Sequence, residues 1–179
     1  MRAVIFDTET TGLVGNRKLP LDQQPEVIEF FGCLVDLKKG KVLKEYETLI
    51  KPKLVQELPP KITEITTITT EMLKDAPTFA EVADDIFAFI QDAPVVIAHN
   101  LRFDKDMLDI EAERLTRTIA WPRRLCTIEQ TMHLKGHRLS LTKLHQLLFD
   151  EPFDGAHRAK VDVQALVRVC QELVKRDVL

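Results

Sequence analysis

The chain has 179 residues, 45% of them hydrophobic and 30% charged, a composition that excludes a wholly disordered protein and suits one domain with a sizeable core. The net charge of −3 excludes a protein that coats long nucleic acids through a general basic excess, so a nucleic-acid substrate would be held over a few nucleotides only. No apolar run approaches the ~20 residues that cross a bilayer.

The first half of the chain is predicted to consist mainly of strands. Short β-branched runs bounded by turn residues indicate strands at 2–7, 27–36 and 42–50, and a turn at 38–41 joins the last two. Three prolines within 52–60 predict an irregular connection after these strands.

In the second half, helices alternate with strands and then follow them. Apolar spacing predicts a helix within 77–92, and a strand follows at 95–98. Asn100 is a favourable N-cap for a helix that runs to about Leu115. Further helices are predicted at 127–134, 140–149 and 161–175. This order predicts an α/β fold of three layers, with helices flanking a central mixed β-sheet, and residues 1–179 forming one domain.

Asp7 and Glu9, at the end of the first predicted strand, are the most informative pair in the sequence. Alternate residues of a strand share a face, so the two carboxylates lie side by side. Like charges at that distance repel unless a proton or a cation lies between them, and Mg²⁺ is commonly held by one or two carboxylates. Gly12 favours a tight turn that exposes backbone N–H groups. The alternative is a polar strand exit, with Asp7 capping backbone groups and Glu9 solvated.

A second candidate segment surrounds Asp104. This acid falls in the first turn of its predicted helix, in line with Met107 and Leu108, where burial without a partner is costly. The alternative is that Asp104 only stabilises the positive end of the helix dipole. Nearby, His99 and Phe103 fit a ledge for a sugar and a nucleobase, or are ordinary core residues.

The third candidate segment contains His157 and Asp162. Residues five apart on an ideal helix point ~140° away from each other, so these two would not share a helical face. Gly155 indicates instead that His157 lies in the loop before the last helix, with Asp162 in the first turns of that helix. An imidazole in such a loop suits a general base at neutral pH, although an exposed loop histidine more often has no catalytic role.

Three motifs occur in a fixed order along residues 2 to about 170. They are Asp7-x-Glu9 within 6–13, His99-Asn100-x-x-Phe103-Asp104, and His157-x-Ala159-x-x-Asp162. Together they resemble the DEDDh family of 3′–5′ exonucleases, which includes the proofreading exonuclease of bacterial replicative polymerases and ribonuclease T. The resemblance implies a ribonuclease H-like fold.

The resemblance also implies a metal-dependent reaction. By analogy Asp7, Glu9, Asp104 and Asp162 would hold two Mg²⁺ or Mn²⁺ ions around the last phosphodiester of a 3′ end. Asp7 would bridge both ions, Glu9 and Asp162 would complete one site, and Asp104 would support the other. His157 would take the proton of the attacking water, and 5′-nucleoside monophosphates would leave single-stranded or frayed nucleic acid.

Substrate contacts follow from the same resemblance. The residues implied are Thr10, Gly12, Leu13, Ile65, Thr66, His99, Asn100 and Phe103. Glu64 departs from the family, because many members carry glycine at that point. Arg102 and Arg158 flank two of the motifs and are either phosphate contacts or solvated surface residues.

Three roles are compatible with this sequence. The leading hypothesis is a free-standing exonuclease, and the second is a proofreading subunit held by a DNA polymerase. The chain ends at Leu179, soon after its last predicted helix, which favours the first because proofreading subunits often carry a C-terminal tether. A non-catalytic nucleic-acid-binding module is the third, and the complete set of acids and histidine argues against it. Three cysteines, spaced unlike a zinc site, and no leader-like segment predict a cytoplasmic protein without membrane association.

Overall fold

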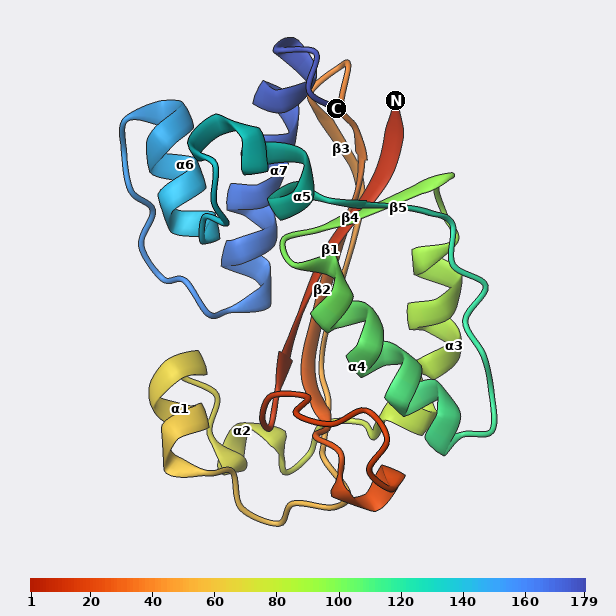
Figure 1. Cartoon of the computed structure of the whole chain (residues 1–179). Helices are drawn as coiled ribbons and strands as arrows, with labels where there is room; N and C mark the ends of the chain where they lie inside the picture. Colours follow the sequence, from red (N-terminus) through yellow and green to blue (C-terminus); the bar gives the residue numbers. More distant parts are fainter.

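A central five-stranded sheet organises the structure, a computed structural model that describes residues 1–179 (Figure 1). The strands lie in the order β3-β2-β1-β4-β5. β2 is antiparallel to both of its neighbours, β1 and β3, whereas β4 and β5 run parallel to β1, so the sheet is mixed as predicted. The strands are β1 (Arg2–Thr10), β2 (Val27–Asp36), β3 (Lys41–Leu49), β4 (Val95–Ala98) and β5 (Arg123–Cys126).

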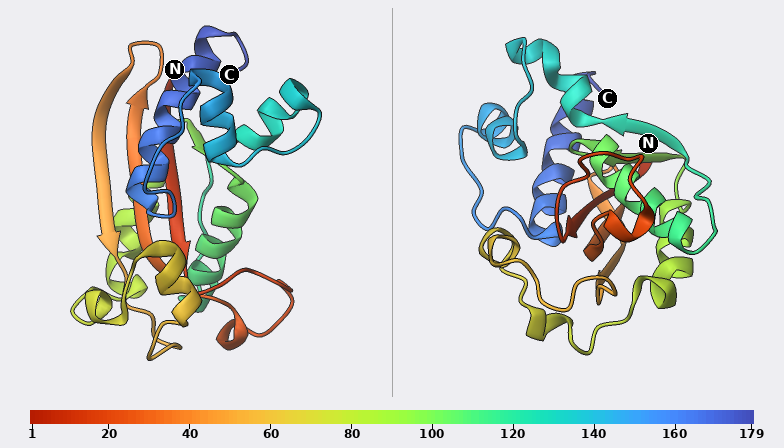
Figure 2. Two further views of the ribbon diagram at one scale, coloured as in Figure 1. Left: turned by 90° about the vertical axis from the view of Figure 1, so that its left-hand side faces the viewer. Right: turned by 60° about the horizontal axis from the view of Figure 1, so that its bottom comes forward.

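Helices cover both faces of the sheet and give the three layers that the sequence predicts. α3 and α4 pack on one face through a core that includes Phe6 and Phe30, and α6 and α7 pack on the other through Ile5 and Phe31 (Figures 1 and 2). The helices are α1 (Pro60–Thr66), α2 (Thr70–Leu73), α3 (Phe79–Ile90), α4 (Leu101–Arg114), α5 (Thr127–Lys135), α6 (Leu141–Phe149) and α7 (Ala159–Lys175). None of them is long and apolar enough to cross a membrane.

Burial on both faces explains why β1 and β2 are apolar without interruption over several residues. Neighbouring residues such as Ile5 and Phe6 enter opposite cores, so both must be apolar. Gly32 on β2 lets Phe89 of α3 pack directly against the strand, because a Cβ there would lie 2.6 Å from a ring carbon of Phe89.

Several local predictions were wrong. β1 continues to Thr10 instead of ending at residue 7, because its last residues still pair with β2. Residues 52–59 are irregular as predicted, but α1 and α2, which follow them, were missed; Pro60 occupies the first position of α1, where proline is well tolerated. β5 was missed altogether. Asn100 lies at the N-cap of α4 but has a left-handed backbone, with φ 72°, and its side chain caps no backbone group.

Candidate active site

A cleft of about 930 Å³ is lined by residues from the end of β1 and from α1, α4 and α7. The first turns of α4 and α7 contribute acids to it, and the loop before α7 contributes His157. Apart from the two arginines Arg102 and Arg158, every residue that the sequence nominated for catalysis, metal binding or substrate contact lines this cleft. They are Asp7, Glu9, Thr10, Gly12, Leu13, Ile65, Thr66, His99, Asn100, Phe103, Asp104, His157 and Asp162.

Three carboxylates converge at the floor of the cleft. Oxygens of Asp7, Glu9 and Asp162 lie within 4.8 Å of one another, and none of the three forms an ion pair. Burial, and then repulsion by Asp104 and Glu9, raises the pKa of Asp7 well above its usual value. Burial, followed by repulsion from Asp162, raises the pKa of Glu9 from 4.5 to about 8. Burial also raises the pKa of Asp162. Such a triplet is stabilised by a proton or by a cation.

Asp104 lies beside this triplet and is held by Thr8. The backbone N–H and the hydroxyl of Thr8 donate to the same oxygen, Oδ1, at 3.1 and 2.9 Å, which leaves the second oxygen for a ligand. Asp104 is only 2% exposed, and burial raises its pKa to about 7 although the bonds from Thr8 lower it. Stabilising the positive end of the helix dipole is therefore not the only role of Asp104, since a solvated acid would serve that purpose without being buried.

His157 lies in the loop before α7, as Gly155 predicts. Gly155 and His157 both have left-handed backbones, with φ 79° and φ 71°. The backbone N–H of His157 donates to Oδ2 of Asp162 at 2.8 Å, so the loop folds back onto the first turn of the helix. The imidazole is exposed and forms no hydrogen bond, so it is free to act on a bound molecule.

Sequence reasoning missed Glu29, which together with Asp104 brings the acids at this site to five. Glu29 lies on β2 directly opposite Glu9 and binds the guanidinium of Arg158. Arg158 is therefore paired with a buried acid and only partly exposed, instead of being a fully solvated surface residue. One signal pointed to the pair: Glu29 interrupts an otherwise apolar stretch of a buried strand, where an acid needs a partner.

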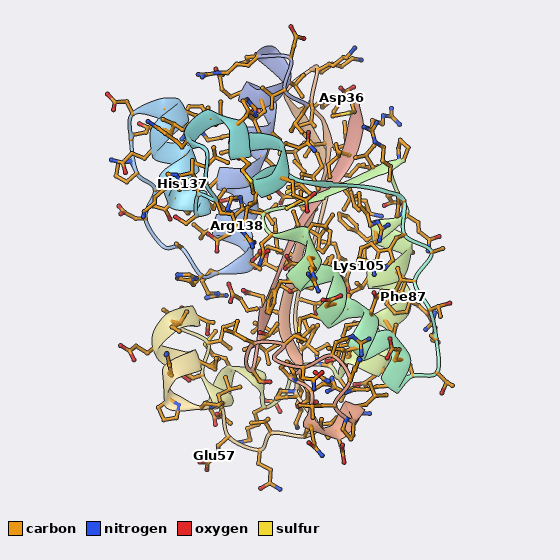
Figure 3. The ribbon with its side chains drawn as sticks, viewed as in Figure 1. Asp36, Glu57, Phe87, Lys105, His137 and Arg138 are labelled. Carbon is orange, nitrogen blue, oxygen red and sulfur yellow. The ribbon has the colours of Figure 1, made fainter.

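Several candidate substrate contacts are engaged within the protein. Both ring nitrogens of His99 form hydrogen bonds, to the Thr127 hydroxyl at 2.9 Å and the Leu139 carbonyl at 3.0 Å. Burial lowers the pKa of His99 to about 4, so it is a neutral, structurally bonded residue at the wall of the cleft. Oδ1 of Asn100 accepts a hydrogen bond from Arg138, which lies in the α5–α6 connection (Figure 3).

Two apolar side chains of the cleft are exposed instead of buried. Leu13 is 83% exposed and Ile65 on α1 is 39% exposed. Exposed apolar side chains beside a polar floor suit the faces of nucleobases. The chain bends at Gly12 as expected, although Gly12 does not adopt a left-handed conformation.

A mixed sheet covered by helices, with an acid triplet at the end of its central strand, defines the class of ribonuclease H-like nucleases. A family model described as "Exonuclease", of the RNase T type, matches residues 4–170. The chain is 35% identical over 178 residues to a putative bifunctional exonuclease/endonuclease protein of Mycobacterium tuberculosis, covering 97% of this chain but 26% of the relative. It is 32% identical over 172 residues to DNA polymerase III subunit epsilon of Treponema pallidum, covering 94% and 72% of the two chains.

Solved structures agree on the fold. The nuclease domain of 3′hExo, a DEDDh family member bound to rAMP, superposes with a TM-score of 0.79 at 17% identity, covering 98% of this chain and 92% of that one. The chain belongs to the DEDDh family of 3′–5′ exonucleases, so the resemblance inferred from its motifs is confirmed. It spans about a quarter of the length of the mycobacterial relative.

Proposed function

We propose that residues 1–179 form one exonuclease domain that hydrolyses the last phosphodiester bond at the 3′ end of single-stranded or frayed nucleic acid, releasing 5′-nucleoside monophosphates. One observation carries the proposal. Asp7, Glu9 and Asp162 converge in a cleft with raised pKa values and no ion pair, beside the free imidazole of His157.

The chemistry of the donors fits hard divalent cations. All candidate ligands are carboxylate oxygens, without sulfur or imidazole, which favours Mg²⁺ or Mn²⁺ over softer metals. Asp7, Glu9 and Asp162 would hold one ion, and Asp7 with the free oxygen of Asp104 would hold a second. When bound, the two ions would acidify the attacking water and stabilise the leaving 3′-oxygen.

His157 would accept the proton of the attacking water. Imidazole is the side chain that takes up a proton most readily near neutral pH, and the ring of His157 is exposed beside Asp162 with both nitrogens free. The bond from its backbone N–H to Asp162 keeps the loop near the acids, while the side chain remains able to rotate toward a substrate.

The walls of the cleft would hold the terminal nucleotide and its neighbour. Leu13, Ile65 and Phe103 offer apolar surface for the bases, and Thr10 to Leu13 offer backbone groups. A net charge of −3 gives little long-range attraction for phosphates, which favours short contacts and non-processive action.

A polymerase-associated proofreading role is the second candidate. It is favoured by the similarity to DNA polymerase III subunit epsilon, of which the chain covers 72%. Co-elution with a replicative DNA polymerase in size-exclusion chromatography tests this role separately from the hydrolysis itself.

The experiment for the proposed function is digestion of matched DNA and RNA oligonucleotides labelled at the 5′ end. With Mg²⁺ or Mn²⁺ we expect a ladder of labelled products that shortens one nucleotide at a time, and with EDTA no shortening. Release of the labelled 5′ nucleotide first, or equal digestion in EDTA, would contradict the proposal. The two ladders also report the sugar preference.

A further inference from the structure

Glu29 is an acid that the proposed reaction does not use, although it lies next to the acids that do. It faces Glu9 across the β1–β2 ladder and is only 1% exposed. Its negative charge repels those of Asp7, Glu9 and Asp162 and so contributes to raising their pKa values. A buried carboxylate in such surroundings is costly unless a specific contact compensates for it.

The compensation comes from the N-terminus of α7. Nη2 of Arg158 donates to Oε1 of Glu29 at 2.7 Å, and Nε of Arg158 lies 3.2 and 3.3 Å from the two oxygens. The backbone N–H of Ala159 donates to Oε2 at 2.9 Å. Forked contacts between arginine and carboxylate fix orientation as well as distance. Arg158 is the N-cap residue of α7, but its side chain caps no backbone group of the helix. Glu29 on β2 takes that place, because its carboxylate accepts the first helical N–H, that of Ala159.

The segment held in this way carries two of the proposed functional groups. His157 immediately precedes Arg158, and Asp162 follows in the first turn of α7. The backbone N–H of Asp162 donates to the Arg158 carbonyl at 3.0 Å, and the N–H of His157 donates to the Asp162 carboxylate. His157 has φ 71°, which is unfavourable for a residue other than glycine and is maintained only by surrounding contacts.

We propose that Glu29 is a positioning residue: with Arg158 it fixes the start of α7, and so sets Asp162 and His157 against the two acids of β1. This inference rests on the proposed function. Glu29 contacts neither substrate nor metal in this account. Arg158 is likewise occupied by Glu29 and does not bind phosphate in this proposal, although it directly follows His157 in the sequence.

The test compares Arg158→Met, Glu29→Gln and the double variant in 5′-labelled oligonucleotide digestion at saturating Mn²⁺. Arg158→Met keeps the aliphatic stem and removes the fork, and Glu29→Gln removes the charge with little change of shape. We expect kcat to fall about 10- to 100-fold in each, because small displacements of reacting groups cost that much. KM should stay within about threefold of its original value. The kcat of the double variant should be no lower than that of either single variant, because each single variant already breaks the same contact between Glu29 and Arg158.

Lys160 and Glu47 provide the matched control. They form an ion pair at 2.7 Å between the same turn of α7 and β3, but both side chains are about half exposed. Lys160→Met should leave kcat within about twofold of wild type, since exposed pairs contribute little. Arg158→Lys keeps a positive charge beside Glu29 and loses only the fork, so it preserves folding. Its kcat should lie between those of wild type and Arg158→Met.

A second readout does not depend on turnover. Mn²⁺ titration of the substrate-free protein by calorimetry should show weaker binding in Arg158→Met than in wild type, because Asp162 is displaced, and unchanged binding in Lys160→Met.

Raised KM with preserved kcat in Arg158→Met would overturn the inference in favour of a phosphate contact. A lower melting temperature with unchanged kcat and Mn²⁺ affinity would overturn it in favour of a purely structural pair. If wild type releases no nucleotide, the proposed function fails, and equal Mn²⁺ affinity in wild type and Arg158→Met then overturns the positioning role as well.

Discussion

Replacing Glu9 with glutamine should stabilise the metal-free protein at alkaline pH. The pKa of Glu9 is raised from 4.5 to about 8, first by burial and then by Asp162, Glu29 and Asp104. The folded state therefore binds a proton that the unfolded state has already released between these two values. Stability from this group is fully present below pH 4.5 and is lost as the pH rises toward 8. At ~1.36 kcal/mol per pH unit, the difference corresponds to roughly 4 to 5 kcal/mol as an upper limit.

The neighbouring acids share the same protons, so the observed gain should be smaller, on the order of 2 to 4 kcal/mol. Glu9→Gln removes the ionisable group and should raise the free energy of unfolding at pH 8 while leaving it nearly unchanged at pH 4.5. Urea unfolding in EDTA at the two pH values measures this difference. Added Mn²⁺ should make wild type the more stable of the two proteins at pH 8, because it binds wild type more tightly than Glu9→Gln.

Glu57→Gln is the matched control for this experiment. Glu57 is exposed, forms no ion pair and lies at the lower end of the molecule in the connection before α1 (Figure 3). Its replacement should change the free energy of unfolding by less than about 0.5 kcal/mol at either pH. The reasoning would be refuted if Glu9→Gln were no more stable than wild type at pH 8 in EDTA, or if Glu57→Gln gained as much.

Three further predictions concern turnover. Asp7→Asn should abolish Mg²⁺-dependent release of mononucleotides, measured by chromatography, while its free energy of unfolding in EDTA is equal to or above that of wild type; undiminished release would remove Asp7 from the proposed metal site. His157→Ala should lower kcat by about 10²- to 10⁴-fold and keep the Mn²⁺ affinity measured by calorimetry, and a loss confined to Mn²⁺ affinity would show that the histidine is a ligand instead of a base. Leu13→Ala should raise KM for oligonucleotides about tenfold through lost apolar contact with unchanged kcat and melting temperature, because Leu13 is 83% exposed in the free protein. Unchanged KM would remove Leu13 from the substrate site.

The parts of the fold that depend on local pattern were predictable from the sequence. β2 and α3 follow from β-branched runs and helical apolar spacing, and their observed bounds agree closely with the predicted ones. β5 was not predictable, because Arg123 and Arg124 are exposed edge residues whose extended conformation comes from pairing with β4. α1 was hidden by Pro59 and Pro60, which resemble a loop until the second proline is recognised as the first helical residue.

The candidate site was predictable as a set of residues and much less as a set of contacts. Motif spacing nominated the acids and His157, and the structure brings them into one cleft. The partners of His99 lie 28 and 40 residues away, and Glu29 and Arg158 are separated by 129 residues. No local period encodes such pairs, since they arise only when the sheet and α7 come together.

Anomalous scattering from crystals grown with Mn²⁺ and a nucleoside 5′-monophosphate tests the central claim most directly. The account predicts two manganese peaks between the carboxylates of Asp7, Glu9, Asp104 and Asp162, with the nucleotide phosphate bound against them and His157 turned toward it. Manganese absent from this cluster, or bound only at exposed acids elsewhere on the surface, would contradict the account.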